Sequence, residues 1–362
     1  MTSSFENRYS WMDRLLHRIA FATGTAQIAL ADIEDKLFES QLGFDVRKPV
    51  FVTALPRAGT TLLLELCFEL EEFTSHCYRD MPFVLNPMLW NHFAAGFRKT
   101  DQLRERAHGD GVLVNTSSPE SFEEIIWKAF WRSHYKKDRI SPWEDEGNPE
   151  FFDFFRNHIR KIIASRGEGA SKPRRYVSKN NLNIARVNLI VQNFDDAVVV
   201  VPYRQPLQHA ASLLRQHLNF LKIHREDLFA RDYMAAIGHF DFGENLRPID
   251  FGGWCSIGEH HDATKLSFWI TYWVATYEHL LGVRKANDRV FLLSYERFCE
   301  SPSQGLEHFA DILALGDRSA LLASAQRIRP AKLHPFKAEI VPPDLLARAE
   351  AVHGELLAAS AW

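Results

Sequence analysis

The stretch FVTALPRAGTTLLLELC, residues 51–67, constrains the fold most, because it has the pattern of a buried strand, a tight turn and a helix. A strand, a turn and a helix in that order begin a βαβ unit. The turn comes directly before the helix, so several backbone N–H groups and the positive end of the helix dipole face one point. We therefore expect an anion to bind this loop. The alternative is an ordinary turn whose threonines cap the helix.

The loop differs from the Walker pattern for binding phosphate, in which glycine and four further residues precede Gly-Lys-Ser or Gly-Lys-Thr. Here Thr60 follows Gly59 at the position of the lysine, and the nearest cation is Arg57. An arginine offers a planar fork of donors to an oxyanion. A transferring γ-phosphoryl group uses Mg²⁺ and lysine together, whereas a sulfuryl group carries one negative charge and can be held by arginine, lysine and backbone donors. The loop therefore favours a guest other than Mg-ATP.

Strands and helices alternate again in the second half of the chain. The stretch DAVVVVPYR has the consecutive valines of a strand that is buried on both faces. Before it we expect a short strand, RYVSKN, and a helix, NIARVNLIVQNF. After it we expect a second helix, QPLQHAASLLRQH. DRVFLLSYERF is a later strand with its exit. This alternation predicts an α/β fold, in which a parallel β-sheet is flanked by helices in a P-loop-like arrangement with helical insertions.

We expect one domain over residues 1–362, with a helical extension at 1–45 and a mainly helical insertion at 81–175. Helical spacing over residues 10–40 favours a helix that packs on the core. The alternative is a surface or dimer helix that contacts a membrane peripherally, because tryptophan and arginine lie close together there.

Two further helices are predicted from local signals. Ser118 and Pro119 fit the N-cap and first position of a helix that continues to about residue 135. Residues 266–283 form the most apolar run, but Glu278 and His279 interrupt it, so we expect a buried helix rather than a membrane span.

Composition excludes some classes of protein. A net charge of −3 argues against a general nucleic-acid-binding protein, so we expect no nucleic acid partner. The four cysteines, Cys67, Cys77, Cys255 and Cys299, form no C-x-x-C pair, which favours free thiols in a reducing compartment. No secretory signal is visible at the N-terminus. We therefore predict a cytoplasmic protein.

Two motifs resemble those of the sulfotransferases that use 3′-phosphoadenosine-5′-phosphosulfate (PAPS). LPRAGTT resembles the loop that binds the 5′-phosphosulfate in this family. VVVPYRQPLQHAASLL resembles the motif for the 3′-phosphate, with Arg204, Pro206 and Ser212 at the matching positions. LLSYERFCESP resembles a late strand exit of the family, and the resemblance covers roughly residues 48–310.

The resemblance implies a P-loop-like sulfotransferase fold and transfer of a sulfuryl group from PAPS to a hydroxyl or amine, with PAP as product and no metal required. It implies that the loop binds the phosphosulfate and that Arg204 and Ser212 bind the 3′-phosphate. Arg204 also ends a buried strand, where open α/β sheets bind ligands. The loop residues in this role are Arg57, Ala58, Gly59, Thr60, Thr61 and Leu62.

A third segment, SKNNLNIARVNLIVQNFDDA, resembles the Glu-Lys-Thr-Pro segment of the family and the helix after it. Its lysine is Lys179, while Ser178 replaces the acid and Asn180-Asn181 replaces Thr-Pro. The resemblance implies that Lys179, together with Arg57, stabilises the charge on the leaving oxygen.

Transfer to an alcohol also needs a base for the acceptor proton. Relatives use a glutamate some twenty residues after the loop, and Asp80 is the nearest carboxylate to that position, so we predict Asp80 as the base. The alternative role is an aspartate paired with Arg79 or capping a turn. His76 is the next candidate, followed by three glutamates: Glu120, Glu123 and Glu124.

The acceptor and two rival functions stay open. The insertion is rich in Trp, Phe, Arg and His, which suits a carbohydrate or glycolipid acceptor, although aromatic residues are also ordinary core. Adjacent His260 and His261 have no partner motif at metal-ligand spacing, so we expect no metal site.

A small-molecule kinase with a degenerate Walker loop would need Mg²⁺ and ATP. A nucleotide-binding protein without catalysis is the other alternative, and we also leave open a homodimer.

Overall fold

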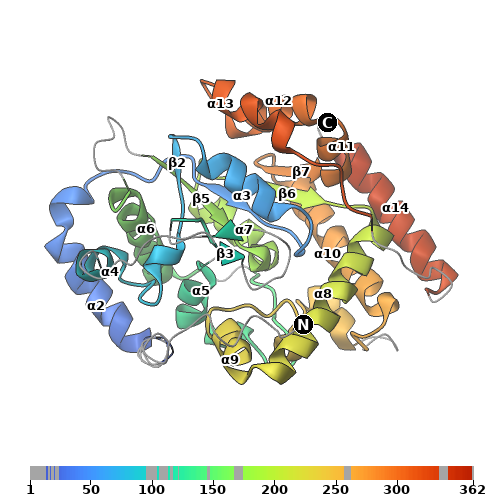
Figure 1. Ribbon diagram of the computed structural model, residues 1–362, viewed down its shortest axis with the longest axis horizontal. Helices are drawn as coiled ribbons and strands as arrows, with labels where there is room; N and C mark the ends of the chain where they lie inside the picture. The colour runs from blue at the N-terminus through green and yellow to red at the C-terminus, as the bar shows by residue number, and fades with distance from the viewer. Residues whose placement is uncertain are drawn as a thin grey trace.

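Five parallel strands form the sheet of the computed structural model (Figure 1), in the order β2-β5-β1-β6-β7. The strands are β1 (Val50–Val52), β2 (Phe73–Thr74), β5 (Arg175–Lys179), β6 (Val198–Tyr203) and β7 (Val290–Ser294). The structure describes residues 14, 17, 20, 24–94, 104–105, 113–114, 117–120, 122–144, 147–166, 174–256, 262–333 and 341–360. The α/β prediction with a parallel sheet is confirmed.

Apolar strands place a hydrophobic core on each face of the sheet, because successive side chains of a strand point to opposite faces. Val50 and Val52 pack with α3 and α12 on one face, whereas Phe51 lies against Phe155, Tyr176 and other aromatic rings on the opposite face. Helices α6, α7, α8, α10 and α14 supply most of this second core. The sheet is therefore buried on both faces, as its valine runs predict.

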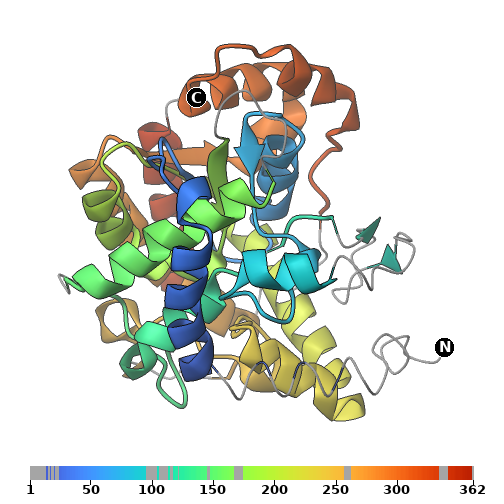
Figure 2. The same ribbon diagram turned by 90° about the vertical axis from the view of Figure 1, so that its left-hand side faces the viewer.

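The helices of this arrangement lie around the sheet in Figures 1 and 2. Their bounds are α2 (Gly24–Leu37), α3 (Thr60–Phe68), α4 (Pro87–Ala94), α5 (Glu124–Phe130), α6 (Pro149–Ala164), α7 (Val187–Asn193), α8 (Pro206–Glu226), α9 (Leu228–Ala236), α10 (Leu266–Ala286), α11 (Tyr295–Glu300), α12 (Pro302–Leu313), α13 (Ser319–Leu322) and α14 (Pro343–Ala359). The apolar run at 266–283 lies in α10, whose aromatic residues are buried, so the prediction of a buried helix is confirmed.

The insertion contains α4, α5 and α6 and a short antiparallel pair, β3 (Arg104–Glu105) and β4 (Leu113–Val114). The prediction that a helix starts at Pro119 is wrong. Pro119 forms an antiparallel bridge with Cys77, and Ser118 accepts a backbone hydrogen bond from Tyr78, so this segment is extended. The helix begins only at Glu124 and ends at Phe130.

Helix α2 is attached to α6 by a buried charge cluster, and Figure 2 shows the two helices crossing. The Nζ of Lys161 lies 3.0 Å from Glu34 and 2.8 Å from Asp35. This contact packs the described part of the predicted N-terminal helix on the core, while Trp11, Leu15 and Ile19 lie outside the described residues. Along the described part of the chain, none of the helices combines the length and apolarity that a membrane crossing requires.

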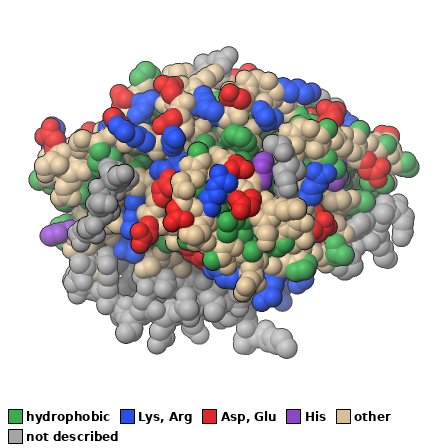
Figure 3. Space-filling view, turned by 90° about the horizontal axis from the view of Figure 1, so that it is seen from above, with side chains coloured by type: hydrophobic (Ala, Val, Ile, Leu, Met, Phe, Trp, Pro, Cys, Tyr) green, Lys and Arg blue, Asp and Glu red, His purple; other side chains and the backbone are tan. Residues whose placement is uncertain are grey.

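The four cysteines are free thiols, as predicted. On the face drawn in Figure 3, acidic and basic side chains are interspersed, which fits the small net charge.

Candidate active site

The loop between β1 and α3 has a backbone that depends on glycine. Arg57 has a φ of 72° and Gly59 has a φ of 99° at the N-cap of α3. A Cβ atom on Gly59 would lie 2.3 Å from Cδ2 of Tyr295, the first residue of α11. Gly59 therefore allows both the left-handed turn and the close approach of the Tyr295 ring, and the loop is fixed between the sheet and α11.

Helix α8 holds the same loop from the other side. His209 is buried, and its Nε2 lies 2.8 Å from the carbonyl oxygen of Pro56. Burial, followed by the charge of Arg204, lowers the pKa of His209 from 6.5 to about 3. His209 is therefore a neutral donor at pH 7 that fixes the loop carbonyl through its Nε2–H. No sequence motif singled out this residue.

Arg204 follows β6 and reaches the loop. Its Nη1 donates to the carbonyl oxygen of Arg57 at 3.4 Å, its Nε lies 3.2 Å from Oε1 of Glu296, and its Nη2 donates to the carbonyl oxygen of Lys332 at 3.2 Å. The guanidinium also lies 5.1 Å from the centre of the Tyr295 ring, a cation–π distance. The two sequence motifs, 147 residues apart, thus meet at one edge of the sheet.

Ser212 lies on α8 with its side chain buried. Its Oγ has no hydrogen-bond partner among the described residues. A buried hydroxyl without a partner costs free energy unless a ligand or water satisfies it. The residue that the resemblance assigns to a phosphate therefore has a hydroxyl available for one.

Lys179 and Asn181 bring the end of β5 to the loop. Lys179 pairs in register with Val52, the last residue of β1. Thr60 donates from Oγ1 to Oδ1 of Asn181 at 3.3 Å, and Thr53 donates to the Asn181 carbonyl oxygen at the same distance. The carboxyl ends of β1, β5 and β6 therefore carry all the predicted donor-binding segments.

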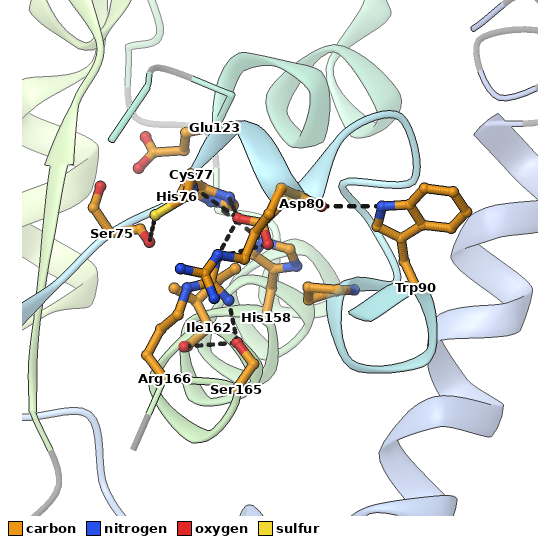
Figure 4. Close-up of polar contacts among 12 residues, drawn as sticks. Ser75, His76, Cys77, Asp80, Trp90, Glu123, His158, Ile162, Ser165 and Arg166 are labelled. Atoms are coloured by element: carbon orange, nitrogen blue, oxygen red, sulfur yellow. Dashed lines mark hydrogen bonds and ion pairs between the residues drawn. The ribbon is translucent and has the colours of Figure 1, made fainter. Parts of the chain in front are cut away.

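Asp80 lies in a separate buried cluster (Figure 4). Arg166 donates from Nη2 to both carboxylate oxygens of Asp80 at 2.6 Å, and the backbone N–H of Cys77 donates to Oδ2 at 2.9 Å. The Asp80 side chain has 0% exposure. Both oxygens are engaged, so this ion pair would have to open before either could reach an acceptor. The role of Asp80 as base stays a prediction.

His76, the second candidate, is part of the same cluster. Its Nε2 lies 3.3 Å from Nε2 of His158, and the two rings stack with centroids 5.0 Å apart. Burial lowers the pKa of His76 from 6.5 to about 4 and that of His158 well below 6.5. Both rings are neutral at pH 7, and one Nε2–H donates to the other ring.

The glutamate candidates each hold structural contacts. Glu124 accepts from Asn180 at 2.7 Å and pairs with Arg186. The guanidinium of Arg186 lies 3.9 Å from the centre of the Trp127 ring and 4.7 Å from that of the Trp143 ring. Glu123 and Glu120 also accept hydrogen bonds. Their donors are Tyr176, Asn183 and Trp127 for Glu123 and Tyr78 for Glu120.

The structure places one more carboxylate near the loop that the sequence did not single out. Asn181 donates from Nδ2 to Oδ2 of Asp241 at 3.2 Å, and Nδ1 of His239 lies 3.9 Å from the same oxygen. Asp241 lies in the connection after α9, in a stretch, HFDFGEN, that matches no motif. Only tertiary packing brings it to the site.

Within the described ranges, the structure has no group of three His, Cys, Asp or Glu side chains that could hold a metal ion. His260 and His261 lie outside the described residues. Asp262, which follows them, accepts hydrogen bonds from Thr264.

Comparisons with known proteins bear on the family and the fold of the chain. A model of the sulfotransferase family matches residues 49–240, more than half of the chain. Sulfotransferase STF9 from Mycobacterium avium is similar in fold, with a TM-score of 0.55 and 13% identity over 99% of this chain and 88% of that one. Sulfotransferase STF1 from Mycobacterium tuberculosis H37Rv has a TM-score of 0.48 and 13% identity, over 91% of this chain and 81% of that one.

A sulfotransferase from Alicyclobacillus acidocaldarius has a TM-score of 0.40 and 12% identity, over 86% of this chain and 94% of that one. No curated protein matches the chain. The family match covers the loop after β1, Lys179, Arg204 and Ser212. The chain therefore belongs to the sulfotransferase family.

Proposed function

We propose that the protein transfers the sulfuryl group of PAPS to a hydroxyl or amine of an acceptor and releases PAP. The observation that carries this proposal is the hydrogen bond from Arg204 to the carbonyl oxygen of Arg57, at 3.4 Å. It brings a predicted site for the 3′-phosphate next to a predicted site for the 5′-phosphosulfate. The unpartnered buried hydroxyl of Ser212 supports the same assignment.

The proposed donor site uses residues from three strand ends. The backbone N–H groups of residues 58–62 lie at the N-terminal end of α3, where the helix dipole favours an anion. Arg57 adds its guanidinium to this loop, and Arg204 and Ser212 take the 3′-phosphate. Bound PAPS supplies the sulfuryl group, which passes to the acceptor as its bond to the 5′-phosphate oxygen breaks. Lys179 and Arg57 stabilise the negative charge on that oxygen. No step requires a metal ion.

We propose a carbohydrate or glycolipid acceptor, and the insertion supports one that carries an apolar part. The tryptophans that suggested sugar binding, Trp127, Trp131 and Trp143, are buried in the core. A cavity of about 360 Å³ has a mainly apolar lining that includes Leu85, Ile125, Lys128, Arg132 and Tyr135. The ring of Tyr135 lies 5.7 Å from that of Trp143. An apolar chain gains free energy by leaving water for such a cavity.

A matched pair of acceptors tests this choice. An alkyl glycoside and the free sugar with the same hydroxyl groups differ only in the apolar chain. We expect a higher kcat/KM for the alkyl glycoside, and the change Ile125→Asp should reduce that preference. Equal rates for the two acceptors would contradict the apolar part of the proposal.

Membrane contact and dimer formation stay predictions. Leu30, Ile33 and Leu37 of α2 are 39%, 53% and 64% exposed and recur at helical spacing, which supports a contact through this helix. We propose a cytoplasmic location, for which free cysteines are typical.

Calorimetry with PAP and with ATP, each with and without Mg²⁺, tests the proposed function. We expect PAP to bind without Mg²⁺ and more tightly than ATP. Preference for ATP with Mg²⁺ would favour the kinase. Tight PAP binding without sulfuryl transfer to any alcohol or amine would favour a nucleotide-binding protein without catalysis.

A further inference from the structure

A chain of hydrogen bonds leads from the loop to Asp241. The Oγ1 of Thr60 donates to Oδ1 of Asn181, which leaves the Nδ2 of the same amide to donate to Oδ2 of Asp241, at 3.3 Å and 3.2 Å. The amide of Asn181 is therefore oriented by two partners. Asp241 lies two hydrogen bonds from the first residue of α3, on the side of the loop where β5 ends.

Asp241 keeps access to solvent, unlike Asp80. Its side chain is 13% exposed, while that of Asp80 has no exposure. Among the described residues, no arginine forms an ion pair with Asp241, whereas Arg166 engages both oxygens of Asp80. A carboxylate can accept a proton from a bound alcohol only if one oxygen is within reach of it. The partial exposure of Asp241 leaves its carboxylate open to an acceptor without the breaking of an arginine pair.

The groups that face Asp241 come from several elements. His239 lies in the same connection, Lys179 at the end of β5, Glu124 at the start of α5 and Tyr272 on α10. Burial raises the pKa of Asp241 above its usual range, against the lowering effect of His239, Asn181 and Lys179. A raised pKa makes the carboxylate a stronger base near neutral pH.

The connection that carries Asp241 is held in place by a close contact with Glu124. Gly238 has a φ of 87°, and a Cβ there would lie 2.3 Å from Cγ of Glu124. The segment therefore packs closely on the side chain of Glu124, which itself accepts a hydrogen bond from Asn180. This packing fixes the distance between Asp241 and the end of β5.

We infer that Asp241 is the base that removes the acceptor proton, and that Asn181 positions its carboxylate. The inference rests on the proposed function. In the transfer step the acceptor oxygen forms a bond to sulfur, the bond from sulfur to the 5′-phosphate oxygen breaks, and the O–H proton goes to Asp241. The carboxyl then returns the proton to water. Lys179, which faces Asp241, stabilises the charge on the leaving oxygen.

The change Asp241→Asn tests the inference, with Asp250→Asn as a matched control. Asp250 is 15% exposed and accepts a hydrogen bond from the backbone of Cys255, so both variants remove a carboxylate of similar burial. We expect Asp241→Asn to lower kcat by about two to four powers of ten. The dissociation constant for PAP should not increase, because Asp241 does not bind the donor and its negative charge opposes that of the PAP phosphates. Asp250→Asn should change neither quantity.

A second readout does not depend on turnover. PAP brings negative charge to the loop and should raise the pKa of Asp241 further, so binding at mildly acidic pH should take up a proton. Calorimetry in two buffers of different ionisation enthalpy measures this uptake, and the phosphates of PAP contribute equally in every variant. We expect less proton uptake in Asp241→Asn than in the wild type and in Asp250→Asn. A thermal unfolding transition in each variant establishes that it is folded, and Asp241→Glu replaces Asp241→Asn should the latter fail to fold.

The outcomes separate this inference from the proposed function. If wild-type protein does not bind PAP, the proposed function fails. If PAP binds and Asp241→Asn keeps the wild-type rate and proton uptake, the inference is wrong. A loss of rate in Asp80→Asn alone, with intact folding and PAP binding, would then assign the base to Asp80.

Discussion

The carbonyl oxygen of Arg57 accepts a hydrogen bond from Nη1 of Arg204, so the loop after β1 and the residue after β6 are joined across 147 residues. The same guanidinium lies over Tyr295, which packs on Gly59. Arg204 therefore has a structural contact with the loop as well as its proposed contact with the 3′-phosphate. Variants of this residue must be examined with nucleotides that differ only in that phosphate.

Arg204→Ala should abolish the preference for PAP over adenosine 5′-phosphate. A charge-assisted hydrogen bond contributes about 1.5–3 kcal/mol, so PAP binding should weaken on the order of 10- to 100-fold. Binding of adenosine 5′-phosphate should weaken much less. Arg289→Ala is the control, because Arg289 also donates to backbone carbonyl groups but lies directly before β7. Calorimetry with both nucleotides measures the ratio, and an unchanged ratio in Arg204→Ala would contradict the assignment.

Gly59→Ala should destabilise the loop. The φ of 99° is unfavourable for alanine, and the new Cβ would overlap the ring of Tyr295 at 2.3 Å. We expect a loss of about 1–3 kcal/mol in the free energy of unfolding and weaker PAP binding. Gly316→Ala is the matched control, since no atom lies within 4 Å of a Cβ at that position. Urea unfolding measures both variants, and equal stabilities would show that the loop adapts to a side chain.

Arg166→Ala should strongly destabilise the fold, because it leaves the buried carboxylate of Asp80 without its partner. Removal of one partner from a buried ion pair costs about 3–5 kcal/mol. The control is Arg318→Ala, which removes an exposed arginine that pairs with Glu307 and Asp311 and should cost less than about 1 kcal/mol. Denaturant unfolding distinguishes the two values. A small effect of Arg166→Ala would contradict the claim that the pair of Arg166 and Asp80 stabilises the fold.

Acid should destabilise the protein between about pH 6.5 and pH 4. The pKa of His76 falls from 6.5 to about 4 in the folded state, because burial disfavours its charged form. The unfolded chain therefore binds more protons than the folded protein in this window. The free energy of unfolding is highest above pH 6.5 and decreases as the pH falls towards 4. The pKa shift of His76 alone corresponds to a loss of roughly 3 kcal/mol in the free energy of unfolding.

Unfolding in urea at several pH values measures this loss. His209 adds to it in the same direction, since its pKa falls to about 3. The variant His209→Gln keeps an amide donor for the Pro56 carbonyl oxygen and removes one titrating ring, so its stability should depend less on pH than that of the wild type. An equal dependence would show that His209 does not titrate between the folded and unfolded states.

Sequence patterns indicated those parts of the candidate site that lie in short continuous segments, and the roles of these residues stay predictions. The loop around Gly59 and the strand end at Arg204 have local patterns, because a strand, a turn and a helix fix where their donors point. The contacts of Asp80 could not be predicted in this way, since Arg166 lies in the turn after α6, 86 residues further on. Asp241 gave no signal, because its partner Asn181 lies 60 residues before it and neither residue belongs to a motif for a base.

The prediction that a helix starts at Ser118 and Pro119 was wrong because it, too, depended on contacts with a distant segment of the chain. Ser118 and Pro119 have the local pattern of a helix N-terminus. Cys77 and Tyr78 pair with this segment through the backbone and keep it extended. Long-range backbone pairing overrode a local preference.

A crystal structure of the protein with PAP tests the central claim most directly. We expect the 5′-phosphate to accept hydrogen bonds from the backbone N–H groups of residues 58–62, and the 3′-phosphate of the same molecule to contact Arg204 and Oγ of Ser212. PAP bound elsewhere, or bound at the loop with its 3′-phosphate directed away from Arg204, would contradict the account.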